Sequence, residues 1–307
     1  MSGNHKNRKQ TTKIIIILLM LALCVVAFLY IVNLTHSRSE ARKAETAAAE
    51  EAEKAATETV PDASQQEGQA AQNSAGTHVI AHRGSAGDDE LSFAAYDKAV
   101  EAGAGYIEAD MVVSADGTVY VAHEDESGPM TGYEGYFSGM SDSQIDSLTT
   151  KAGNKVLKLT ELFDKYGDSV TYVVDIKYND PRNAEALVKT VKDYGNEGNV
   201  VAASFLPKAL SAVEEDLPDM TKIYLCSDQG TFNAALGYSF ADVLCVPADI
   251  MNADNLKAAR DNGKQFSAWT LNTEEEIKSA IELGVDTYFT DDSALAVRLE
   301  GENRQAE

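Results

Sequence analysis

Two histidines that stand beside acidic residues carry the clearest chemical signal in this sequence of 307 residues. Of the five histidines, only His82 and His123 follow apolar runs that could end as buried strands within a folded domain. An imidazole, with a reference pKa of about 6.5, can donate or accept a proton at neutral pH. The pair therefore predicts a proton donor and a proton acceptor, although either histidine alone is more often structural.

Three acidic residues also occur in apolar runs that could be buried strands. Glu108 and Asp110 are two residues apart, and side chains at this spacing on a strand point to the same side. Two inward-pointing carboxylates repel each other and lose hydration unless a cation neutralises them. With Asp175 from the next strand they could form an all-oxygen site for a divalent cation, Ca²⁺ or Mg²⁺. The alternative is a hydrogen-bonded acid pair that closes one end of the fold.

Arg83 directly follows His82, and Lys177 comes two residues after Asp175. Both suit a phosphoryl group, and the arginine guanidinium can bind it through two parallel hydrogen bonds. A metal, two cations and two histidines would stabilise charge on phosphorus while protons move on and off oxygen. The residues therefore predict cleavage of a phosphodiester, but they do not identify the substrate.

The elements that must position these residues alternate from residue 78 onward. Short β-branched runs alternate with amphipathic stretches, which is typical of β/α units on a parallel sheet. Eight such units favour an α/β fold closed as a TIM-type (β/α)8 barrel, with catalytic groups at the carboxyl ends of the strands. An open doubly wound sheet is the alternative, but no GxGxxG follows the first strand. The predicted strands are residues 78–81, 106–113, 171–176, 200–203, 222–226, 243–246, 266–270 and 287–290.

Helix-length segments separate most of these strands. The predicted helices are residues 93–102, 159–165, 181–194, 207–216, 231–236, 253–262 and 273–283. A hairpin return is expected at residues 120–122. It is followed by a long Gly-, Ser-, Asp- and Tyr-rich loop over residues 124–158, which could cover the substrate.

The N-terminal part of the chain predicts a membrane anchor. Residues 14–32 form an uninterrupted apolar run without charge, and basic residues precede it. The basic flank should stay cytoplasmic, which places the remaining chain outside the cell. A cleaved signal peptide is the alternative. The predicted segments are a cytoplasmic segment (1–13), a transmembrane helix (14–34), a flexible Ala/Glu-rich spacer (35–76), the barrel (77–300) and a tail (301–307).

Composition limits the classes of partner and ligand that the protein is expected to bind. The net charge of −23 argues against nucleic acid, because phosphate backbones select Lys and Arg. The three cysteines lack metal-ligand spacing. Cys226 and Cys245 are expected to be buried apolar side chains, and a pairing between neighbouring strands is the alternative.

The ordered motifs of residues 78–299 resemble those of the glycerophosphodiester phosphodiesterase family. The motifs are Ala81-His82-Arg83-Gly84, Ile107-Glu108-Ala109-Asp110, Asp116-Gly117-x-Val119-x-x-Ala122-His123, Val174-Asp175-Ile176-Lys177, Ser204-Phe205, Ala268-Trp269-Thr270-Leu271-Asn272 and Gly284-Val285-Asp286 through Thr290-Asp291. The family's Pro-Glu-Asn-Thr stretch reads Asp89-Glu90-Leu91-Ser92 here, and Asp175 stands where the family usually has Glu.

The resemblance implies Ca²⁺- or Mg²⁺-dependent hydrolysis of a glycerophosphodiester. It makes His82 and His123 the acid/base pair, and Glu108, Asp110 and Asp175 the metal ligands. It also implies that Arg83 and Lys177 contact phosphate, with Glu90 and Trp269 near the substrate. A lysophospholipid substrate, a cyclising phospholipase C-like reaction and a catalytically degenerate binding module are the alternatives.

Overall fold

The computed structural model describes residues 77–85 and 89–306. The predicted cytoplasmic segment, transmembrane helix and spacer lie outside the described residues. Within the described part of the chain, no helix has the length and apolar character needed to cross a membrane.

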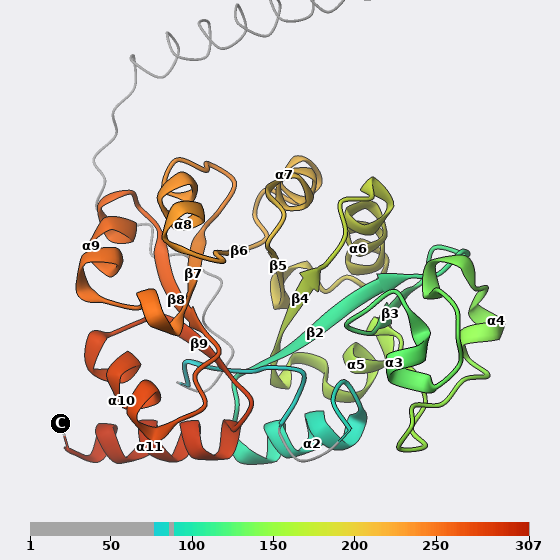
Figure 1. Ribbon diagram of the computed structural model, residues 1–307, viewed down its shortest axis with the longest axis horizontal. Helices are drawn as coiled ribbons and strands as arrows, with labels where there is room; N and C mark the ends of the chain where they lie inside the picture. Colours follow the sequence, from blue (N-terminus) through green and yellow to red (C-terminus); the bar gives the residue numbers. More distant parts are fainter. Residues whose placement is uncertain (1–76, 86–88, 307) are drawn as a thin grey trace, which may run out of the picture. The chain divides into compact units, whose positions relative to one another are not determined.

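Parallel strands form a closed barrel (Figure 1). The hydrogen-bonded order is β1-β9-β8-β7-β6-β5-β4-β2-β3, and all neighbours run parallel except β2 and β3. A further pairing of β1 with β2 closes the eight parallel strands into a ring, which excludes the open sheet. The strands are β1 (Val79–Ala81), β2 (Tyr106–Val113), β3 (Val119–Val121), β4 (Thr171–Ile176), β5 (Val200–Ser204), β6 (Lys222–Leu225), β7 (Val243–Pro247), β8 (Gln265–Trp269) and β9 (Thr287–Thr290).

The alternation of side chains along each strand separates two apolar layers. On β4, Tyr172 and Val174 pack outward against the helices, while Val173 points into the barrel. The interior cluster consists of Ile80, Val173, Val201, Ala203, Ile223, Leu225, Val243, Cys245 and Phe289. Cys226 and Cys245 are both buried free thiols, as the sequence favours.

Helices cover the outside of the barrel (Figure 1). Pro181 and Pro207 begin two of them, and Thr273 with Glu276 forms a capping box on a third. The principal helices are α2 (Phe93–Ala102), α5 (Leu159–Tyr166), α6 (Pro181–Tyr194), α7 (Pro207–Asp216), α8 (Gln229–Ala235), α9 (Ala253–Asp261), α10 (Glu274–Leu283) and α11 (Ser293–Ala306). The predicted boundaries agree within about two residues for the other helices, but the sequence did not predict α11.

The long loop after β3, called the insertion (residues 124–158), has structure that the sequence did not predict. It contains α3 (Ser127–Thr131), the 3₁₀ turn η2 (Phe137–Gly139) and α4 (Asp142–Ile145). Phe137 and Ile145 are fully buried in a small core that the insertion shares with β2 and β3. The chain then returns to β3, where Lys158 pairs with Tyr120. The insertion is therefore a packed substructure attached to the β2–β3 hairpin.

The turn after β1 leaves no space for side-chain atoms at Gly84. Its φ is +93°, and a Cβ atom there would lie 2.6 Å from the Cβ atom of Ala95 on α2. Glycine therefore allows α2 to pack directly against the turn that carries His82 and Arg83.

Gly84→Ala should lower the free energy of unfolding by roughly 2–4 kcal/mol, because it combines overpacking with a strained left-handed backbone. Urea unfolding of the purified protein measures this loss. Gly117→Ala is the matched control, since its φ is +89° but no atom lies within 4 Å of the added Cβ. Equal losses for the two variants would contradict the packing argument.

Candidate functional site

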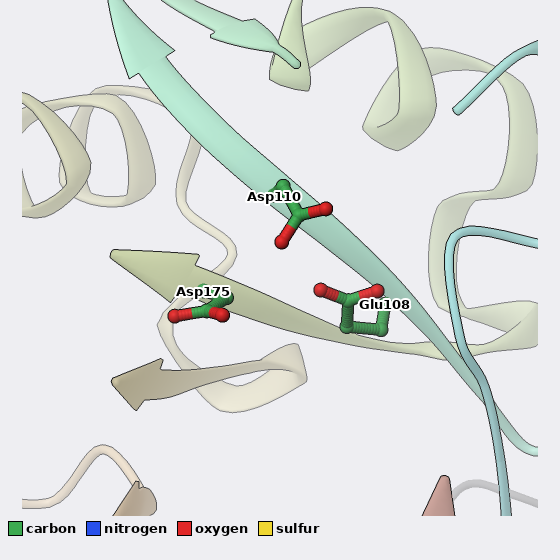
Figure 2. Close-up of side chains that lie close together, drawn as sticks. All are labelled: Glu108, Asp110 and Asp175. Carbon is green, nitrogen blue, oxygen red and sulfur yellow. The ribbon is translucent and has the colours of Figure 1, made fainter. Parts of the chain in front are cut away.

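Glu108 and Asp110 of β2 come together with Asp175 of the neighbouring strand β4 (Figure 2). Parallel pairing places Asp110 of β2 directly beside Asp175 of β4. One carboxylate oxygen from each residue lies within 4.8 Å of the others, and all three side chains are buried. The register of the two strands thus gathers the three acids that the sequence predicts.

Two cations reach the same carboxylates. Lys177 Nζ lies 2.7 Å from Asp110 Oδ1 and 2.6 Å from Asp175 Oδ2. Arg83 Nε lies 3.0 Å from Asp110 Oδ2, and the Arg83 backbone N–H donates to Glu108 Oε2 at 2.8 Å. The φ of Arg83 is +54°, a conformation that costs a non-glycine residue about 1–3 kcal/mol.

Burial and mutual repulsion raise the pKa values of Glu108 and Asp175. Burial, together with the charges of Asp110 and Asp175, raises the pKa of Glu108 well above its usual range. Burial also raises the pKa of Asp175 to about 6, although Lys177 opposes the shift. Burial alone would lower the pKa of Lys177, but Asp175 and Asp110 raise it overall. Lys177 is therefore fully charged at neutral pH.

The donor set fits a hard divalent cation. All of its atoms are carboxylate oxygens, as Ca²⁺ and Mg²⁺ prefer. Asp175 Oδ1 is buried and has no hydrogen-bond partner among the described residues. With all groups ionised, three carboxylates face two cations, so a negative charge remains to be compensated. Glu108, Asp110 and Asp175 would hold the ion.

His82 is held by a residue from the far end of the sequence. Its Nδ1 lies 2.6 Å from Asp291 Oδ1, and the Asn272 side-chain amide donates to Asp291 Oδ2 at 2.6 Å. The hydrogen bond with His82 lowers the pKa of Asp291, so this carboxylate is ionised and accepts a hydrogen bond from the imidazole Nδ1–H group. The other ring nitrogen, Nε2, is then the one available for proton transfer.

His123 follows β3 and lies within the electrostatic influence of the charged cluster. Burial lowers the pKa of His123, opposed by Asp110 and assisted by Arg83 and Lys177. Its Nδ1 lies 2.9 Å from Glu124 Oε1. The next residue, Asp125, is tied to the end of β4 because its backbone N–H donates to the Tyr178 hydroxyl at 2.7 Å. His123 is therefore neutral at physiological pH. The hydrogen bond of Asp125 restrains the segment that carries it.

The two predicted substrate residues differ in their link to this cluster. Glu90 Oε2 accepts a hydrogen bond of 3.2 Å from Arg83 Nη1. Trp269 packs edge-on against Phe205, with ring centroids 5.2 Å apart, and donates from Nε1 to the Cys226 carbonyl. Glu90 is thus tied to the charged cluster, whereas Trp269 forms an aromatic pair on β8.

Asp291 and Asn272 are the residues that sequence reasoning left without a role. Both stand at predicted strand ends, which was the one available signal. His78, by contrast, lies before β1 at the opposite end of the barrel, where its Nδ1 contacts the Asp286 carbonyl at 2.7 Å.

The structure combines a closed (β/α)8 barrel with three clustered carboxylates, two cations and two histidines. This combination defines a hydrolase site suited to phosphate esters. The family model for the Glycerophosphoryl diester phosphodiesterase family matches residues 82–295, more than half of the chain. The chain therefore belongs to this family and is an enzyme of the phosphoric diester hydrolase class.

Known proteins similar to this chain cover about three quarters of its length. A glycerophosphodiester phosphodiesterase of Caldanaerobacter subterraneus subsp. tengcongensis is 28% identical over 73% of this chain and 97% of its own. The structure of a glycerophosphodiester phosphodiesterase from Thermotoga maritima has a TM-score of 0.61 at 25% identity, covering 73% and 98% of the two chains. A phosphodiesterase from Oleispira antarctica, solved with the product sn-glycerol-3-phosphate, has a TM-score of 0.64 at 20% identity, covering 73% and 96%.

Metal affinity should rise with pH, because protons compete with the cation for Asp175 and Glu108. With the pKa of Asp175 at about 6, deprotonation of this group alone should strengthen Mg²⁺ or Ca²⁺ binding about tenfold from pH 5 to pH 7.5. Calorimetric titration at both pH values tests this. Asp175→Asn should weaken binding, while the exposed Asp180→Asn serves as the control. Affinity independent of pH would contradict the assignment of these ligands.

Proposed function

We propose that the protein hydrolyses glycerophosphodiesters to an alcohol and glycerol phosphate, in a reaction that depends on Ca²⁺ or Mg²⁺. The observation that carries the proposal is the placement of two histidines with carboxylate partners beside a cluster of three acids and two cations. Binding alone requires no proton-transfer pair. The substrate class is supported by membership of the family and by the product bound to the Oleispira antarctica relative.

The proposed mechanism divides the work among the residues of the site. Arg83 and Lys177 bind the phosphoryl oxygens and oppose their charge. His123, neutral at physiological pH because of its lowered pKa, accepts a proton from the water molecule that attacks phosphorus. His82, oriented by Asp291 through Nδ1, donates a proton from Nε2 to the leaving oxygen as its bond to phosphorus breaks. A divalent ion held by Glu108, Asp110 and Asp175 would supply additional charge stabilisation.

His82→Ala and His123→Ala should each lower kcat at least 100-fold, because each removes one partner of the proton transfer. The assay follows glycerol 3-phosphate release by the detergent-solubilised full chain from a panel of glycerophosphodiesters, with and without chelator. His78→Ala is the matched control and should retain activity, since this histidine lies at the opposite end of β1.

Three results would contradict the proposal. Activity that persists in chelator excludes the metal-dependent mechanism. Accumulation of a cyclic phosphate identifies the cyclising reaction instead. A wild-type chain that neither binds a divalent metal nor releases product is the degenerate binding module.

We further propose that residues 14–34 anchor the enzyme in the cell membrane by a single helix. The support is the uncharged apolar run and the basic residues before it, which orient the N-terminus toward the cytoplasm. Residues 1–13 would then be cytoplasmic and the barrel extracytoplasmic.

The anchored enzyme should sediment with membranes, require detergent for release, and be cleaved by protease added to intact spheroplasts. A cytoplasmic protein of the same cells controls for lysis. A soluble, shortened chain would instead identify residues 14–34 as part of a cleaved signal peptide. Protection of the barrel from external protease would contradict the proposed orientation.

A further inference from the structure

The loop that follows β1 carries three consecutive side chains with separate partners. Leu91 is buried in the core, and its backbone N–H donates to the Arg83 carbonyl at 3.0 Å. Glu90 accepts from the Arg83 guanidinium. Asp89 turns to the insertion, where its Oδ2 accepts hydrogen bonds from the Thr150 hydroxyl and from Asn154 Nδ2, the latter at 3.0 Å.

The two partners of Asp89, Thr150 and Asn154, lie in one turn that is held by its own hydrogen bonds. Thr150 is buried, its backbone N–H donates to the Asn154 carbonyl at 2.6 Å, and its hydroxyl accepts from the Asn154 backbone N–H at 3.2 Å. The flanking residues Thr149 and Lys155 pair as an antiparallel bridge. The Lys151 N–H also donates to the Met130 carbonyl at 2.9 Å, so the turn is joined to the end of α3.

The backbone next to Asp89 has an unfavourable conformation that surrounding contacts must stabilise. Leu91 has a φ of +60°, and Arg83, whose carbonyl it bonds, has a φ of +54°. A non-glycine residue in this region persists only where surrounding contacts hold it. Asp89 is two residues from Leu91 and next to Glu90, so the contact with the insertion restrains the segment that holds the Arg83 guanidinium.

We infer that Asp89 is a positioning residue through which the insertion fixes Arg83 for phosphate binding. The path runs from the Thr150–Asn154 turn to Asp89, along the backbone to Glu90, and across the 3.2 Å hydrogen bond to Arg83. This inference rests on the proposed phosphate-binding role of Arg83. It assigns the insertion a part in substrate binding that requires no contact between the insertion and the substrate.

The chain offers a closely matched control in Asp142. This carboxylate also accepts two side-chain hydrogen bonds, from the Ser114 and Thr118 hydroxyls at 2.6 Å each. It fastens the insertion to the β2–β3 hairpin, but no described contact leads from it to Arg83 or Glu90. Asp89→Ala and Asp142→Ala therefore remove equal numbers of hydrogen bonds from the insertion and differ in their link to Arg83.

The test measures inorganic phosphate binding by calorimetry and kcat/KM for glycerol 3-phosphate release, using the metal-loaded full chain in detergent. Asp89→Ala should weaken both about tenfold, because displacing a substrate-binding group by a fraction of an ångström has effects of this size. Asp89→Asn, whose amide oxygen can still accept both bonds, should stay within about threefold of wild type. Asp142→Ala should lower the Tm as much as Asp89→Ala does, yet also stay within about threefold in both readouts.

A double-mutant cycle with Thr150→Val adds a second criterion. Because Thr150 is expected to act only through Asp89, the pair Asp89→Ala/Thr150→Val should be no weaker in phosphate binding than Asp89→Ala alone. Additive losses, or equal losses for Asp89→Ala and Asp142→Ala, would overturn the inference. Wild-type protein that binds phosphate without releasing glycerol phosphate would refute the proposed hydrolysis instead, and the calorimetric comparison would still decide the role of Asp89.

Discussion

Burial of three carboxylates on two adjacent strands is the constraint on which the rest of the site depends. An uncompensated buried carboxylate costs several kcal/mol, and three would exhaust the 5–15 kcal/mol that typically separates a folded domain from its unfolded chain. Lys177 contacts both Asp110 and Asp175, and Arg83 contacts Asp110. The raised pKa values of Glu108 and Asp175 show that this compensation is incomplete. A site with residual negative charge and two fixed cations is suited to bind a cation and a phosphate together.

The barrel supplies the geometry that makes this charge cluster possible. Pairing of β2 with β4 sets Asp110 beside Asp175, and the two-residue period directs Glu108 to the same side. Closure through β1 and β9 then brings the turn carrying His82 beside Asp291. Each of these contacts joins separate strands of the barrel, so the site is complete only when the ring is closed.

The insertion extends this support beyond the barrel. It starts directly after His123 and is joined to the end of β4 through Asp125 and Tyr178. It returns along β3 and reaches the loop after β1 through Asp89. The insertion therefore contacts both the segment that carries His123 and the loop that carries Arg83. It has its own apolar core around Phe137.

The sequence by itself determined the strands and most helices of the barrel and most of the site. The two-residue period along β2 predicts that Glu108 and Asp110 share a face, and the alternation of strands and helices predicts the closed barrel. Such signals are local, because side-chain direction and propensity depend on near neighbours in the chain. The anchor at residues 14–34 stays a prediction of the same local kind.

Only the tertiary structure decided which charges meet. The contact between His82 and Asp291 joins residues 209 positions apart, and that between Asp89 and Thr150 joins residues 61 apart. Neither has a periodic signature, since each depends on barrel closure or on how the insertion folds back. The left-handed backbone at Arg83 is likewise imposed by its surroundings, against the preference of the residue itself. Local propensity thus placed the reactive groups on their strands, and long-range packing selected the partners that orient them.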